Sequence, residues 1–189
     1  ELFWNKKWNK AFLHEPPNIK WFEGGKINIT SNIFEKNPLD FKKLKDKAAI
    51  IWEPESPEER ERRITYGELF EEVNRFANAL KKLGVKKGDR VGVYMPIIPE
   101  IVVALLACAR IGAVHAVVFS AFSPTALRVR LQDTEAKVLI TADGYFRRGK
   151  ALNLKDNADE GIKETSVEKM VVVRRTGENV RWDQQKNFY

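Results

Sequence analysis

The sequence predicts an α/β fold with a largely parallel sheet and crossover helices. Three short runs rich in β-branched and aromatic residues alternate with two segments that carry helix signals; the runs are Arg90–Tyr94, Val114–Phe119 and Lys137–Thr141. This alternation is typical of a βαβαβ unit, because parallel strands need a crossover connection. Crossovers are almost always right-handed, so we expect the loops that follow these strands to gather at one edge of the sheet.

The segment before this unit predicts a short strand pair followed by a long helix. Ala48–Trp52 is typical of a strand, and Ile64–Tyr66 is placed to pair back with it. The run Thr65-Tyr66-Gly67-Glu68 has the form of a capping box, which marks a helix start. The apolar residues that follow recur at helical spacing, and Gly84 marks the helix end because glycine tolerates positive φ.

The crossover segments each carry a helix start. Pro99 suits the first turn of an apolar helix that Gly112 closes, and Ser123 followed by Pro124 has the N-cap and first-turn pattern of the next helix. Further along, Leu152–Glu164 is a weaker helix candidate.

The last part of the chain predicts one more strand. Lys169–Val173 continues the same alternation, whereas the sequence after Gly177 turns polar and predicts no closing element. We therefore divide the chain into residues 48–189, the first part of an α/β domain, and residues 1–47, an N-terminal arm.

The arm shows no sustained periodicity and is rich in aromatics and lysines. Its aromatic residues lie among lysines, Pro16-Pro17 and Gly24-Gly25; they include Trp4, Trp8, Phe12, Trp21 and Phe22. We expect an extended arm that packs these rings on the domain. Stacking on single-stranded nucleic acid is the alternative, but no nucleic-acid-binding motif accompanies the rings, so we expect no nucleic acid partner.

Composition places the chain among globular proteins. It has 43% hydrophobic and 31% charged residues, and its formal charge of +7 favours an anionic ligand. The single cysteine, Cys108, lies in an apolar helix and is expected to be a buried structural thiol, and His115 is expected to be a buried or half-buried, hydrogen-bonded residue of a strand. No signal peptide or membrane span is evident, so a cytoplasmic location without a membrane partner is expected.

A basic loop follows the third strand of the unit. The sequence ADGYFRRGK places Arg147, Arg148 and Lys150 at the strand's carboxyl end, where α/β folds usually hold phosphorylated ligands. Arginine can grip a phosphate with two nitrogens, lysine adds a point charge, and Gly149 lets backbone approach a ligand closely. The helix start at Ser123 is expected at the same edge. A plain solvated loop is an equally good interpretation of the spacing.

Other chemistry-bearing motifs are missing from the sequence. It contains no G-x-x-x-x-G-K-[ST] loop, no G-x-G-x-x-G after a strand, no G-x-S-x-G elbow and no Cys/His cluster with zinc spacing. The residues thus predict a ligand-facing edge but no catalytic residue in this chain and no metal site.

Several long segments resemble AMP-forming acetyl-coenzyme A synthetases, members of the adenylate-forming enzyme superfamily. The segments are WFEGGKINITSN, ITYGELFEEVNRFANALKKLGVKKGDRVGVYMPIIPE, LLACARIGAVHAVVFSAFS and KVLITADGYFRRGK. The resemblance implies a ligase that activates acetate or a similar short carboxylate with ATP and Mg²⁺ and transfers the acyl group to CoA. It also implies that the chain is an N-terminal part of such an enzyme, inactive alone, with the ATP-binding and catalytic residues beyond Tyr189.

The resemblance also assigns part of a CoA site. The family's R-G-G-[KR] run aligns with Arg147, Arg148, Gly149 and Lys150, and its G-G-F-S segment places Ala121 near the CoA nucleotide. Arg148 and Ala121 each replace a family glycine, and so does Tyr145. A non-catalytic α/β module that binds a phosphorylated ligand is the alternative function.

Overall fold

The computed structural model describes residues 2–36, 40–56 and 58–188. Its centre is a parallel five-stranded sheet in the order β11-β10-β7-β5-β6. The strands are β5 (Arg90–Met95), β6 (Val114–Phe119), β7 (Val138–Ala142), β10 (Lys169–Val173) and β11 (Asn187–Phe188). The predicted α/β class with a parallel sheet is confirmed.

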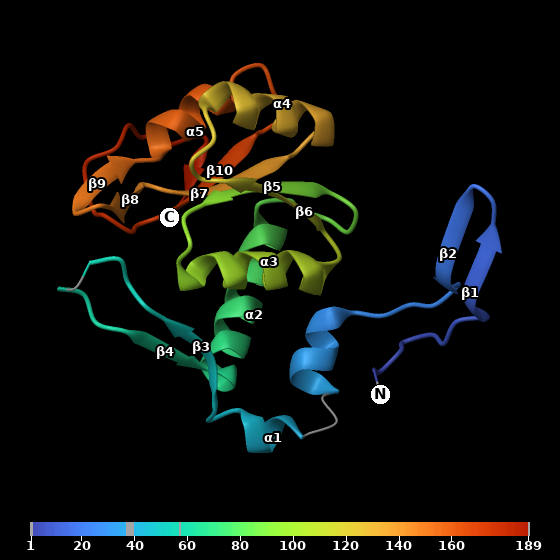
Figure 1. Cartoon of the computed structure of the whole chain (residues 1–189). Helices are drawn as coiled ribbons and strands as arrows, with labels where there is room; N and C mark the ends of the chain where they lie inside the picture. Colours follow the sequence, from blue (N-terminus) through green and yellow to red (C-terminus); the bar gives the residue numbers. More distant parts are fainter. Residues whose placement is uncertain (1, 37–39, 57, 189) are drawn as a thin grey trace.

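Helices cover both faces of this sheet (Figure 1). On one face α2 (Tyr66–Lys82) and α3 (Pro99–Ile111) bury a core with the strands that includes Leu80, Ala107 and Ile140. On the other face α4 (Pro124–Thr134) and α5 (Lys155–Gly161) bury Leu131, Ala158 and Met170. The result is three layers, helix–sheet–helix, which explains why the central strands are apolar on both faces.

The strand order reverses direction beside β5. The chain leaves β5 through α3 to reach β6 on one side, then returns through α4 to β7 on the other side of β5. Such a reversal is the topological switch point of an open α/β sheet, and ligands bind outside the carboxyl ends of the strands there. The loops after β5, β6 and β7 therefore lie where a ligand site is expected in such a fold.

Most predicted helix boundaries are confirmed, but those of the candidate helix Leu152–Glu164 are wrong at both ends, because residues 152 and 153 lie in a strand and α5 covers only Lys155–Gly161. The Thr65 hydroxyl accepts a hydrogen bond from the Glu68 amide at 3.2 Å, and the Glu68 carboxylate accepts one from the Thr65 amide at 2.7 Å, which completes the capping box. Gly112 ends α3 with φ of 74°. The Ser123 hydroxyl accepts a hydrogen bond from the Ala126 amide at 3.3 Å and starts α4.

A separate antiparallel pair precedes α2. It consists of β3 (Ala48–Trp52) and β4 (Arg62–Thr65). The second strand begins and ends earlier than the predicted Ile64–Tyr66, because Thr65 serves as the N-cap and Tyr66 already belongs to α2. The loop between β3 and β4 reaches toward β8 (Gly144–Arg147) and β9 (Lys150–Asn153) (Figure 1).

The first residues form a hairpin that stands away from the sheet (Figure 1). Its strands are β1 (Lys10–Glu15) and β2 (Asn18–Glu23). The rings of Trp4, Trp8 and Phe22 contact one another, with centroids 4.7 to 5.1 Å apart. The short π-helix η1 (Ser31–Glu35) and the helix α1 (Phe41–Leu44) follow.

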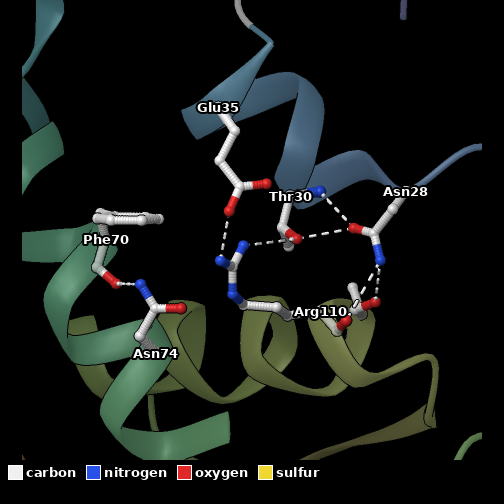
Figure 2. Close-up of polar contacts among 7 residues, drawn as sticks. Asn28, Thr30, Glu35, Phe70, Asn74 and Arg110 are labelled. Atoms are coloured by element: carbon white, nitrogen blue, oxygen red, sulfur yellow. Dashed lines mark hydrogen bonds and ion pairs between the residues drawn. The ribbon is translucent and has the colours of Figure 1, made fainter. Parts of the chain in front are cut away.

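Residues 28–35 are fastened to the carboxyl end of α3 (Figure 2). Arg110 donates to the Glu35 carboxylate at 2.6 Å and lies over the Phe70 ring at 5.3 Å. The Asn28 amide donates to the carbonyl oxygens of Ala109 and Arg110 at 3.0 and 3.3 Å, and so satisfies carbonyls that a helix end leaves without partners. The hydrogen bond from Arg110 lowers the pKa of Glu35, although burial opposes it. A boundary at residue 47 between arm and domain stays a proposal.

Two further expectations about local structure are wrong. A short closing element does follow Gly177: β11 pairs with β10 at the edge of the sheet, with Met170 opposite Asn187. His115 is exposed instead of buried, because β6 is the other edge strand of the sheet. Cys108 is fully buried among apolar residues of α3 and the sheet, as expected.

Candidate functional site: the cleft at the carboxyl ends of the strands

The predicted basic loop is a β-hairpin. Its strands β8 (Gly144–Arg147) and β9 (Lys150–Asn153) are antiparallel. The turn consists of Arg148 and Gly149, whose φ angles of 50° and 72° are both positive, the combination of a type I′ turn. The sequence did not predict this hairpin, because arginine rarely occupies the left-handed region and Asn-Gly or Gly-Gly is the usual signal.

Two cations flank this turn. Arg147 and Lys150 are directly opposite each other in the register of the hairpin, so their side chains leave the same face. Both residues are exposed, as are Arg148 and Gly149. Like charges in opposite positions repel, so a ligand with a matching negative charge would relieve a local cost.

A cleft of about 440 Å³ opens where the predicted edge lies. Its walls come from the end of β3 and the loop after it, the loop after β5, the end of β6 with the loop after it, and β8. Among the predicted site residues, Arg147 and Ala121 line this cleft. Arg148, Gly149 and Lys150 lie at the exposed tip of the hairpin instead. The structure therefore places Arg147 and Ala121 in the lining of one cleft and leaves Lys150 on the hairpin face opposite Arg147.

The loop that carries Ala121 is held by Tyr94 of β5. The Tyr94 hydroxyl lies 3.0 Å from the Ser120 carbonyl oxygen and 2.7 Å from that of Phe122. The side chain is fully buried, and burial raises the pKa of Tyr94. Because both neighbours of Ala121 are fixed this way, its exposed methyl group has a set position at the cleft wall.

Arg175, which sequence reasoning missed, also lines this cleft. Its guanidinium pairs with Glu59 at 2.6 Å and lies over the rings of Trp52 and Phe146, at 5.2 and 4.8 Å. Arg175 follows the carboxyl end of β10, so the rule that singled out the residues after β7 would have found it. Its partner Glu59 is 116 positions away, which no local pattern reveals.

Acidic residues also reach the cleft. Glu53 and Glu55 line it, and the Glu55 carboxylate accepts a hydrogen bond from the backbone amide of Arg148. The cleft therefore has lining residues of both charges. Of its two arginines, Arg175 pairs with Glu59, whereas Arg147 has no carboxylate partner in the described part of the chain.

A larger cavity of about 720 Å³ lies elsewhere, between α2, α3 and the sheet. Its floor includes Phe76, Ala104 and Ile140, and Arg62 and Glu100 pair across its rim at 2.8 Å. This cavity opens on a helix-covered face and not at the ends of the strands. Cavity size alone therefore does not identify the ligand site.

Two features are missing from the described residues. Within residues 2–36, 40–56 and 58–188, no group of three or more His, Cys, Asp and Glu side chains is arranged to hold a metal ion. No helix in the part of the chain that the structure describes is long and apolar enough to cross a membrane.

This strand order and this cleft define an open α/β protein with a cleft at the switch point, where folds of this class bind their ligands. Comparison with known families then identifies the class. The sequence model described as AMP-binding enzyme matches residues 38–188, and that described as acetyl-coenzyme A synthetase N-terminus matches residues 1–33. The chain belongs to the AMP-binding enzyme family.

Individual relatives agree with this assignment. The chain is 50% identical to an acetyl-coenzyme A synthetase of Rubrobacter xylanophilus and 46% identical to a 3-hydroxypropionyl-coenzyme A synthetase of Sulfurisphaera tokodaii, in both cases over 100% of the chain and 29% of the relative. Its fold is similar to that of acetoacetyl-CoA synthetase from Streptomyces lividans, with a TM-score of 0.86, 27% identity, and coverage of 98% of this chain and 28% of that one. The chain thus spans less than a third of the length of these relatives.

Proposed function

We propose that the chain is the N-terminal part of a cytoplasmic ligase that converts acetate, or a similar short carboxylate, and ATP to an acyl adenylate and then transfers the acyl group to CoA. The names of the relatives support this reaction class. The part proposed for this chain is to supply one wall of the CoA site. Adenylation chemistry is assigned to residues outside it.

The observation that carries the CoA assignment is the placement of Arg147. It is a cation without a carboxylate partner among the described residues, it lines the cleft at the switch point, and Lys150 lies opposite it on the same hairpin face. Phosphate groups are bound by such pairs, the arginine through two nitrogens and the lysine as a point charge. Arg148 and Gly149 shape the turn, and Ala121 lines the same cleft as Arg147.

The roles of these residues in the reaction are binding and orientation. Arg147 and Lys150 would hold the phosphates of CoA, so that its thiol end points away from the hairpin into the rest of the enzyme. ATP needs Mg²⁺ to neutralise its phosphates during adenylation. No described side chains gather as Mg²⁺ ligands, so the proposal assigns no residue of this chain to that ion.

The test is a kinetic comparison in the full-length enzyme that carries this chain. Arg147→Ala should raise the KM for CoA and leave acetate-dependent ATP–pyrophosphate exchange unchanged, because exchange needs no CoA. The loss of one charge-assisted contact costs about 1.5–3 kcal/mol, roughly a 10- to 150-fold change. Arg75→Ala is the matched control, since Arg75 is 71% exposed on α2 and pairs only with Glu72 among the described residues. An equal loss in both assays would contradict the assignment.

The 189-residue chain by itself is expected to produce no AMP from acetate, ATP and CoA. AMP formation by the purified chain would contradict the division of labour proposed here. Binding of CoA by the isolated chain without any ligase activity in the full-length protein would instead support a non-catalytic module for a phosphorylated ligand.

A further inference from the structure

Asp143 lies between β7 and β8, and its carboxylate is surrounded by backbone amides. The residue is only 2% exposed. One carboxylate oxygen, Oδ1, accepts hydrogen bonds from the amides of Gly144, Arg175 and Thr176 at 2.7, 2.8 and 3.0 Å, and Oδ2 accepts one from Gly177 at 2.7 Å. A buried charge is costly unless it is hydrogen-bonded in this way. These bonds join the start of the hairpin to the segment after β10.

The backbone of Asp143 secures the other end of the same hairpin. Its carbonyl oxygen accepts hydrogen bonds from the amides of Leu154 and Lys155, at 3.0 and 3.2 Å, directly after β9. Its own amide donates to the Val173 carbonyl oxygen at 3.0 Å, at the end of β10. Asp143 therefore contacts both ends of the hairpin and the end of the neighbouring strand.

Close packing at Gly144 supports this arrangement. A Cβ atom placed at Gly144 would lie 2.5 Å from the Leu152 carbonyl oxygen and 3.1 Å from the side chain of Thr176. The absence of a side chain at this position lets the hairpin base and the segment after β10 meet. The base of the hairpin is thus a rigid, fully paired junction.

The same junction fixes Arg175, which contacts the hairpin higher up. The Arg175 amide donates a hydrogen bond to Asp143, and the Arg175 guanidinium lies 4.8 Å from the centroid of the Phe146 ring. Phe146 directly precedes Arg147 in the sequence. The pair with Glu59 extends this contact to the loop between β3 and β4. One buried carboxylate thereby determines the position of two walls of the cleft.

We propose that Asp143 is a positioning residue of the anion-binding hairpin: it fixes the hairpin base and Arg175 so that Arg147 and Lys150 face the ligand. This inference rests on the proposed function, since the ligand is taken to be CoA. Asp143 does not touch the ligand. It acts through the two cations, and its effect must disappear when they are removed.

Asp143→Asn is the informative change. The carboxamide keeps the size of the side chain and one acceptor oxygen, but its NH₂ group faces an amide that needs an acceptor. In the full-length enzyme the KM for CoA should rise about tenfold or more, as expected for losing hydrogen bonds to a charged group, while ATP–pyrophosphate exchange stays within about twofold. In the Arg147→Ala/Lys150→Ala background the same change should raise the KM for CoA by less than about twofold.

The possible outcomes separate the two proposals. If Arg147→Ala leaves the KM for CoA unchanged, the CoA assignment itself fails. If Arg147→Ala raises this KM but Asp143→Asn does not, or raises it equally in both backgrounds, only the positioning role of Asp143 fails. An equal loss of exchange and CoA-dependent activity would assign Asp143 to general stability and overturn the inference as well.

A measurement on the unmodified full-length enzyme covers the case in which Asp143→Asn does not fold. Hydrogen exchange should be as slow at the amides of Gly144, Thr176 and Gly177 as at those of β7, because all are bound to one buried carboxylate. Exchange as fast as at the exposed turn amide of Gly149 would overturn the proposal.

Discussion

The carboxylate of Glu55 accepts a hydrogen bond from the backbone amide of Arg148, 93 positions further along the chain. This amide belongs to a turn in which successive residues have positive φ. Glu55 therefore places a negative charge beside the hairpin tip, within the cleft that Arg147 lines. An incoming phosphate would meet this carboxylate and compete with it for the same donors.

The first prediction concerns this competition. Glu55→Gln in the full-length enzyme should lower the KM for CoA roughly two- to tenfold, because it removes a like charge at a partly exposed site. The effect should shrink as salt increases. The measurement is the KM for CoA at two ionic strengths, with Glu61→Gln as the control, since Glu61 lies in the same loop as Glu55 but pairs with Arg63 of β4. A higher KM would show that Glu55 supports the hairpin more than it opposes the ligand.

The second prediction concerns the turn residue Arg148. An arginine at φ of 50° is strained, whereas Asn-Gly is the preferred pair for such a turn. Arg148→Asn should stabilise the 189-residue chain by about 0.5–1 kcal/mol in urea unfolding. Arg147→Asn removes the same charge from an ordinary strand position and should give no such gain. Equal effects of the two changes would mean that charge, not backbone conformation, is responsible.

The third prediction concerns the thiol of Cys108. Burial raises its pKa to about 12, so almost no thiolate exists at pH 8 in the folded chain. A thiol reagent should react with the folded chain at least a hundredfold more slowly than with the chain in guanidinium chloride. Because the unfolded thiol ionises first, stability should also fall as the pH rises above the ordinary thiol pKa. Rapid labelling of the folded chain would contradict the burial of this side chain.

The fourth prediction concerns Tyr94 and the loop that carries Ala121. Tyr94→Phe removes the hydroxyl that bonds to the carbonyl oxygens of Ser120 and Phe122. The Ser120 carbonyl, which is buried, and the partly buried Phe122 carbonyl lose this partner, so the free energy of unfolding should fall by about 1–3 kcal/mol. Tyr66→Phe at the start of α2 is the control and should change it by less than about 0.5 kcal/mol. A neutral result for Tyr94→Phe would mean that the loop is held by other contacts.

The fifth prediction is a pH dependence that arises from Asp143. Burial alone would raise its pKa, but the four backbone amides outweigh burial and hold the pKa below the ordinary aspartate value. The unfolded chain therefore takes up this proton first as the pH falls. The stability contributed by Asp143 should be present above pH ~4 and be lost progressively below it. The free energy of unfolding should depend less steeply on pH between pH 3 and 6 in Asp143→Asn than in the unmodified chain. The same pH dependence in both would assign the acid sensitivity to other carboxylates.

The sequence by itself determined the class of fold and most of its local elements. Three of these features depend only on residues close together in the sequence, so local rules predict them. They are the capping box at Thr65, the apolar stripe of α2 and the Ser123-Pro124 start of α4. The carboxyl end of β7 was likewise found from alternation and the handedness of crossovers. Arg147 and Ala121 reach the cleft as that argument expects.

Only the tertiary structure decided how that edge becomes a site. The hairpin depends on Arg148 taking a backbone conformation that its side chain disfavours. Glu55 accepts a hydrogen bond from the Arg148 amide, and Asp143 accepts one from the Gly144 amide at the hairpin base. His115 is exposed because β6 is an edge strand, and β11 forms at the opposite edge of the sheet. The order of strands in a sheet is not encoded in the residues of any single strand. Glu59 and Arg175 are separated by 116 positions, so their pairing follows from packing and not from any pattern in the chain.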